Sequence, residues 1–86
     1  MHELSLALEI CRVAETYIDP DRLGSLRTVA VEVGEDSNVE LENFRFCLEA
    51  LLGAPPFGSA SPSLISTPGT DMRIAWLEVD DDRPTH

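Results

Sequence analysis

Basic side chains are scarce in this 86-residue chain. Six Lys or Arg residues stand against sixteen Asp or Glu residues, which gives a formal net charge of −10 at pH 7. The electrostatic field of such a chain repels phosphate backbones and anionic lipid headgroups. We therefore expect neither nucleic-acid binding nor membrane-surface binding, whereas metal cations and basic protein surfaces suit this charge.

A long apolar run is also lacking. The longest uncharged stretch, residues 50–70, is rich in Pro, Gly and Ser, which excludes a transmembrane helix. Glu3 and Glu9 occupy positions where a signal peptide would carry a basic and then an apolar region. We therefore expect a cytoplasmic protein. The length predicts one small α+β domain over residues 1–79, followed by a flexible acidic tail over residues 80–86.

Cysteine is nearly absent, and the two that occur, Cys11 and Cys47, form no Cys-x-x-Cys pair. Structural zinc needs four nitrogen or sulfur ligands at suitable spacing. The two histidines, His2 and His86, lie at opposite ends of the chain. We therefore expect no zinc. Both cysteines are interpreted as reduced packing residues, and a disulfide between them would require two helices to set them close together.

Apolar residues recur at helical spacing in two segments, residues 3–18 and 39–52, with Pro20 and Gly53 as stop signals. Ser37 or Asn38 is the expected cap of the second helix. The buried stripe of the first helix is predicted to hold Leu4, Ala7, Leu8, Cys11, Ala14 and Ile18, and to be widened by Leu6, Ile10, Val13 and Tyr17. The stripe of the second is predicted to hold Leu41, Phe44, Leu48, Leu51 and Leu52.

Alternation of β-branched and polar residues predicts a strand within residues 25–35, a weaker one at 63–67 and a third at 71–79. The third pattern breaks phase, so a bulge is expected at Ala75–Trp76. Pro68–Gly69 predicts a tight turn joining two antiparallel strands. The order α-β-α-β-β predicts a two-layer domain, with both helices on one face of a three-stranded sheet.

The chain begins Met1-His2-Glu3. A free α-amino group and an imidazole both lose a proton near neutral pH, and His is the commonest metal-binding side chain. The amine, the His2 peptide nitrogen and the His2 imidazole can close fused chelate rings around one ion, an arrangement that suits Ni(II) and Cu(II). Glu3 could add a carboxylate or a peptide nitrogen, or serve the helix start. On position alone, an exposed histidine without a ligand is the simpler interpretation.

No catalytic constellation is present: the sequence contains neither a Ser/His/Asp set nor a glycine-rich phosphate loop, so we do not expect an enzyme. The expected sheet face without helices carries Trp76, which we interpret as a partner-binding residue. The same face or a sheet edge could support a homodimer. Glu40 and Glu42 are assigned to the start of the second helix.

Several stretches together resemble the HypA/HybF family of hydrogenase nickel-incorporation proteins: "MHELSLALEI", "VAVEVGE", "VELENFRFCLEALL" and "DMRIAWLEV". The resemblance implies a nickel metallochaperone that delivers Ni(II) to [NiFe]-hydrogenase precursors with a partner GTPase, and in some organisms to urease. It also implies a nickel site at the Met1 amine, the imidazole and backbone nitrogen of His2, and Glu3.

The sequence departs from that family at one place. Family members carry a zinc domain between the last two strands, held by two Cys-x-x-Cys pairs, whereas this chain has "STPGTD" there. The simplest interpretation is the nickel-binding domain without the zinc module. The alternative is a metal-free protein-interaction module, or an accessory paralogue, that keeps the fold without delivering nickel.

Overall fold

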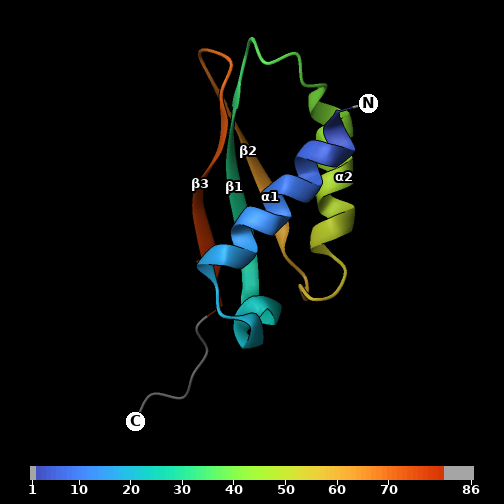
Figure 1. The fold of residues 1–86 in the computed structure, drawn as a ribbon, viewed down its shortest axis with the longest axis vertical. Coiled ribbons are helices and arrows are strands. Elements are labelled where there is room, and N and C mark those ends of the chain that lie inside the picture. The colour runs from blue at the N-terminus through green and yellow to red at the C-terminus, as the bar shows by residue number, and fades with distance from the viewer. Residues whose placement is uncertain (1, 81–86) are drawn as a thin grey trace.

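A computed structural model describes residues 2–80 of the chain. Both α-helices lie on one face of a three-stranded sheet (Figure 1), which confirms the two-layer α+β prediction. A short 3₁₀ helix follows the first α-helix, where the sequence predicted only a helix stop. Residues 81–86 of the predicted tail lie outside the described residues. In chain order the elements are α1 (Glu3–Tyr17), η1 (Pro20–Ser25), β1 (Leu26–Gly34), α2 (Leu41–Leu52), β2 (Ser61–Thr67) and β3 (Met72–Val79).

The central strand of the sheet is β1, with β2 parallel to it on one side and β3 antiparallel on the other. The two strands that Pro68–Gly69 joins are antiparallel, as predicted, but β2 and β3 do not pair with each other because β1 lies between them. The reason is the crossover through α2, which returns the chain parallel to β1 and leaves the other edge of β1 for β3. Residues 68–71 consequently cross over the end of β1.

The predicted bulge in β3 is confirmed. Ala30 lies opposite Trp76 and Val31 lies opposite Ile74, so Ala75 is the extra residue in the register. The bulge turns both halves of β3 the same way. As a result, four apolar side chains of β3 pack against the core: Met72, Ile74, Leu77 and Val79.

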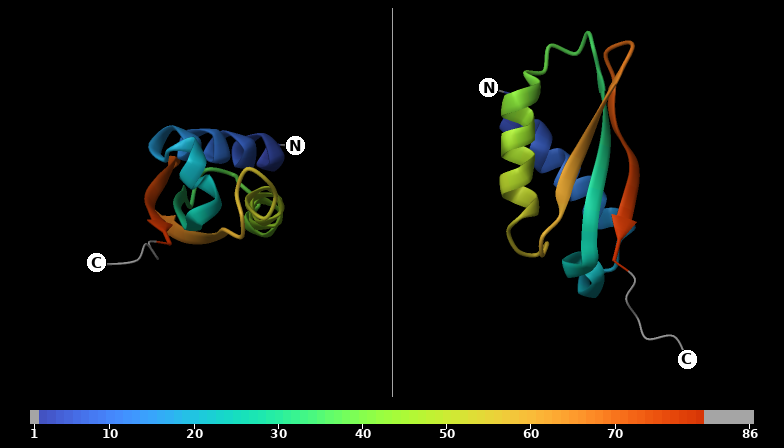
Figure 2. Two further views of the ribbon diagram at one scale, coloured as in Figure 1. Left: turned by 90° about the horizontal axis from the view of Figure 1, so that it is seen from below. Right: turned by 180° about the vertical axis from the view of Figure 1, so that it is seen from behind.

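The core lies between the sheet and the two helices, as the end-on view in Figure 2 shows. Its fully buried large side chains include Phe44 and Leu48 of α2 and Val29 of β1. The predicted stripe of α1 is partly wrong, because Leu4 and Leu8 are 46% and 51% exposed, whereas Ile10, predicted to widen the stripe, is buried. Helix α1 packs against both α2 and β3. Its buried face is therefore rotated relative to the predicted stripe. Leu41 of α2 is likewise exposed.

The predicted cap of α2 is also wrong. Glu40 is the N-cap, and its side-chain Oε1 accepts a hydrogen bond from the Asn43 backbone N–H at 2.8 Å. The Ser37 hydroxyl instead donates to the Gly34 carbonyl at 2.7 Å. Asn38 has φ of 64°, so it turns the chain toward the helix rather than capping it. Helix α2 ends at Leu52, just before Gly53, as predicted.

Candidate metal centre

His2 occupies the N-cap position of α1 and is exposed. Its carbonyl oxygen accepts the first helical hydrogen bond, from the Leu6 N–H at 2.8 Å, but its imidazole makes no capping bond. The backbone at His2 thus serves the helix while the ring does not. Met1, the other predicted donor at this end, lies outside the described residues.

Glu3, the first helical residue, is half-buried and directed toward the start of α2 rather than toward solvent. Its Oε2 accepts a hydrogen bond from the Glu40 backbone N–H at 3.0 Å, and its Oε1 lies 3.5 Å from the Asn43 side-chain nitrogen, which donates to it. The hydrogen bond from the Glu40 N–H is the largest of several causes that lower the pKa of Glu3. The carboxylate is therefore held ionised by the beginning of another helix.

The structure brings the start of α1 beside the N-terminal end of α2, as Figure 1 and the rear view in Figure 2 both show. Glu40 lies at the start of α2, as predicted, but the sequence did not indicate that the Glu3 side chain reaches it. The two residues are 37 positions apart. No local pattern connects them, so only the packing of α1 against α2 could reveal the contact.

Side-chain ligands for a metal are sparse elsewhere. Within residues 2–80, no group of three or more His, Cys, Asp or Glu side chains is arranged to hold an ion. Cys11 and Cys47 are both free thiols. Burial raises the pKa of Cys11 to about 11, with a further contribution from the charge of Glu15, which makes it a poor ligand at neutral pH.

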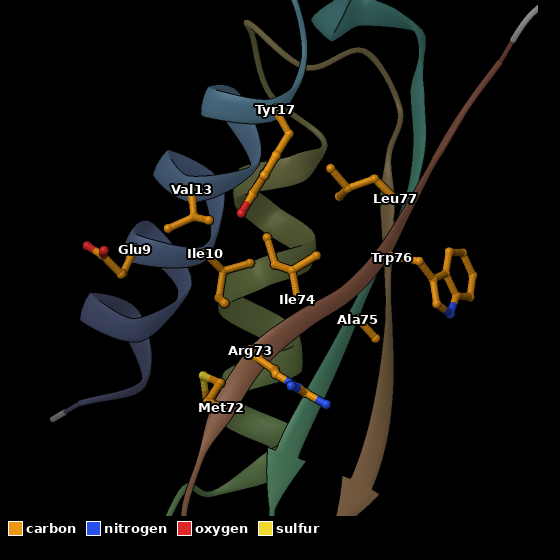
Figure 3. Close-up of a pocket in the computed structure, with 10 residues that line it drawn as sticks. All are labelled: Glu9, Ile10, Val13, Tyr17, Met72, Arg73, Ile74, Ala75, Trp76 and Leu77. Atoms are coloured by element: carbon orange, nitrogen blue, oxygen red, sulfur yellow. The ribbon is translucent and has the colours of Figure 1, made fainter.

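Trp76 lies on the sheet face that bears no helix and is 50% exposed. Its indole points away from α1 (Figure 3). On the helical side of β3, a groove of about 710 Å³ separates the strand from α1. Its apolar walls are formed by Ile10, Val13, Tyr17, Met72, Ile74 and Leu77. The predicted partner residue and the predicted metal-binding end thus lie on different faces of the molecule.

Comparison with known families decides the membership of the chain. A family model described as "Hydrogenase/urease nickel incorporation, metallochaperone, hypA" matches residues 1–70. The chain belongs to the HypA family. The match spans α1 to β2 and so contains both the Met-His-Glu opening and the Glu3–Glu40 contact. The description of the HypA family names a metallochaperone rather than a catalyst.

Curated HypA relatives support the same membership. The hydrogenase maturation factor HypA of Albidiferax ferrireducens is 32% identical over 78 residues, which cover 91% of this chain and 69% of the relative. The hydrogenase maturation factor HypA of Rhodopseudomonas palustris is 33% identical over 76 residues, which cover 88% of this chain and 64% of the relative. The chain thus spans about two thirds of the length of these HypA proteins.

No helix in residues 2–80 has the length and apolar character needed to cross a bilayer.

Proposed function

We propose that this chain is a cytoplasmic nickel metallochaperone that binds one Ni(II) at its N-terminus and assists the maturation of [NiFe]-hydrogenase. The ion is its cargo. The donors are the Met1 amine, the His2 peptide nitrogen and imidazole, and Glu3. The observation that carries the proposal is the family match beginning at Met1, joined to a His2 imidazole that the helix does not use. Amine, peptide and imidazole nitrogens suit the planar geometry of Ni(II).

Family membership also supports the partners in this proposal. A maturation GTPase and the hydrogenase large-subunit precursor are the recipients that a nickel-incorporation protein of this kind serves. The net charge of −10 favours a basic contact surface on such a partner, because the long-range attraction speeds association. No zinc is required by this proposal, because the donors at the N-terminus are nitrogen and carboxylate groups rather than thiolates.

Calorimetric titration of nickel into protein with an authentic N-terminus tests the metal site. We expect one ion per chain. His2→Ala should abolish that binding, and so should two residues added before Met1, because they displace the amine. His86→Ala is the matched control and should bind as the unmodified chain does. Equal affinity in the His2 variant and the control would overturn the proposal. Mass spectrometry of the intact protein must show a free, untrimmed Met1 in each preparation.

A second candidate function, a metal-free protein-interaction module, is favoured by the exposed Trp76. Trp76 lies opposite Ala30 in the register and is 50% exposed on the sheet face that no helix covers. The sheet edges are less suitable for a homodimer, since β2 carries Pro62 and β3 carries the bulge. The face around Trp76 is therefore the surface for this function.

Binding of the purified maturation GTPase separates the two functions. If the interaction module is correct, Trp76→Asp weakens binding while His2→Ala does not. Phe46→Asp is the control, because Phe46 is 69% exposed on α2, away from the sheet face. If nickel delivery is correct, His2→Ala stops nickel transfer to the hydrogenase precursor even where GTPase binding persists. Transfer that survives His2→Ala would favour the interaction module.

A further inference from the structure

Two neighbouring rows of side chains cross the sheet face that bears no helix. Each row takes one residue from β2, one from β1 and one from β3, and the rows are Ser63–Ala30–Trp76 and Ser61–Thr28–Glu78. Trp76 is 50% exposed, and the two residues in line with it are small. No large neighbour in its row therefore covers the indole, and the ring can accept a flat group from another molecule.

Glu78 lies two residues after Trp76 on the same strand. Side chains at such positions point to the same face of a sheet, about 7 Å apart along the strand. The Glu78 side chain is exposed, and its Oε1 accepts a hydrogen bond from the Thr28 hydroxyl at 2.9 Å. Within residues 2–80, Glu78 belongs to none of the ion pairs. A negative charge without a cation thus lies beside the exposed indole.

A polar hollow adjoins Glu78. Its volume is about 360 Å³, and its lining includes Glu78 and the hydroxyl-bearing residues Ser59 and Ser61. Carboxylate and hydroxyl oxygens accept hydrogen bonds. Arg27 also lines the hollow, but its guanidinium is paired with Asp80 at 2.9 Å. The hollow therefore favours a cationic group that carries several N–H donors.

The row on the other side of Trp76 contains an ion pair of its own. The Arg73 side chain donates to the Glu32 carboxylate at 2.7 Å, and the two residues lie opposite each other in the register. Their charges cancel, so the charge that a ligand meets next to Trp76 is that of Glu78. The net charge of −10 adds long-range attraction for basic segments and repulsion between copies of the chain.

We propose that this face docks an arginine-bearing segment of a partner protein, with the guanidinium stacked on the Trp76 indole and hydrogen-bonded to the Glu78 carboxylate. A guanidinium is planar, permanently charged and rich in N–H donors, so it can stack and donate at the same time. Tryptophan is the best aromatic partner for such a cation. The inference rests on the second candidate function above, and it specifies the chemistry of the partner.

NMR titration with a short peptide tests this chemistry. The probe is acetyl-Ser-Val-Arg-Val-Ser-amide, and two matched peptides carry citrulline or lysine in place of arginine. We expect the arginine peptide to shift the resonances of the Trp76 indole N–H and the Glu78 backbone N–H. The citrulline peptide lacks the charge and the lysine peptide lacks the plane, so both should bind about threefold more weakly or worse. Equal affinity of the three peptides, or shifts confined to other parts of the molecule, would overturn the proposal.

Variants of the face provide the second arm, followed at the Ala30 amide, which every variant retains. Trp76→Ala and Glu78→Gln should each weaken binding of the arginine peptide about two- to fivefold, as expected for exposed contacts of these kinds. Trp76→Phe keeps an aromatic ring and should bind with intermediate affinity. The matched controls, Phe46→Ala and Glu49→Gln, are exposed on α2 and should bind as the unmodified chain does. Unchanged affinity in Trp76→Ala would overturn the proposal.

Failure of this inference is distinguishable from failure of the function on which it rests. The peptide titration concerns the sheet face alone, whereas binding of the maturation GTPase concerns the whole function. Binding of the arginine peptide without binding of the GTPase would contradict the second candidate function and support the docking chemistry. Analytical ultracentrifugation should show a monomer. A dimer that dissociates in Trp76→Ala would assign this face to a second copy and overturn the proposal.

Discussion

Gly34, the last residue of β1, donates its backbone N–H to the carbonyl oxygen of Asp71 at 2.7 Å. This bond holds the connection between β2 and β3 where it crosses the end of the central strand. The next two backbone N–H groups, of Glu35 and Asp36, donate to Thr67 and Gly69 at 2.7 and 2.8 Å. The crossover is thus fastened by main-chain bonds, and it leaves no room for a side chain at Gly34.

Gly34→Ala should destabilise the fold. A Cβ at this position would lie 2.9 Å from the Asp71 nitrogen and still closer to the Gly69 carbonyl. Both neighbours are backbone groups, which cannot move away without distorting the connection between β2 and β3. We expect a loss of about 1–3 kcal/mol in the free energy of unfolding, measured by urea denaturation. Gly24→Ala is the control, because nothing lies within 4 Å of its Cβ. Equal losses in the two variants would contradict this account of the crossover.

Phe44 and Phe46 should differ sharply although they lie two positions apart on α2. Phe44 is fully buried and Phe46 is 69% exposed. Phe44→Ala should cost about 3–5 kcal/mol, a large share of the stability of a small domain. Phe46→Ala should change it by no more than about 0.5 kcal/mol. Chemical denaturation followed by far-UV circular dichroism measures both losses. Similar unfolding midpoints for the two variants would contradict the assignment of Phe44, and not Phe46, to the core.

The two cysteines should react with a thiol reagent at very different rates. Burial holds the pKa of Cys11 at about 11, so at pH 8 only about one thiol in a thousand is the reactive thiolate. Because the pKa is raised, that fraction grows tenfold with each pH unit until the pH approaches 11. Cys47 is only half-buried and should be alkylated first. Mass spectrometry of peptides after brief iodoacetamide treatment would reveal the order, with fast labelling of native Cys11 as the contrary result.

Trp76 is the single tryptophan, so its fluorescence reports on one face of the sheet. Its half-exposed indole should be quenched by acrylamide in the free protein. A protein partner docked on that face should reduce quenching and shift the emission to shorter wavelength, because the ring loses water. Nickel should leave the emission wavelength unchanged, since His2 lies on the helical side of the sheet. A nickel-dependent wavelength shift would mean that metal binding reaches Trp76.

The elements of this fold are predictable from local pattern, and their arrangement is only partly so. The β3 bulge follows from four apolar residues whose alternation changes phase, a signal contained within eight residues. The sheet order does not follow in the same way, because Pro68–Gly69 favours a turn whether the flanking strands pair or straddle β1. Burial of α1 was misjudged at Leu4 and Leu8, since the exposed side of a helix depends on which neighbours it meets.

The candidate site is likewise only partly predictable from local sequence. The donors proposed at Met1 and His2 belong to adjacent residues, so the sequence alone was enough to propose them. Whether Glu3 turns toward those donors or away from them depends on a helix that begins 37 positions later. Only tertiary packing places the N–H of Glu40 beside its carboxylate. Which donor atoms are present depends only on the covalent structure of neighbouring residues. The direction in which a side chain points depends on the groups that the rest of the fold places beside it.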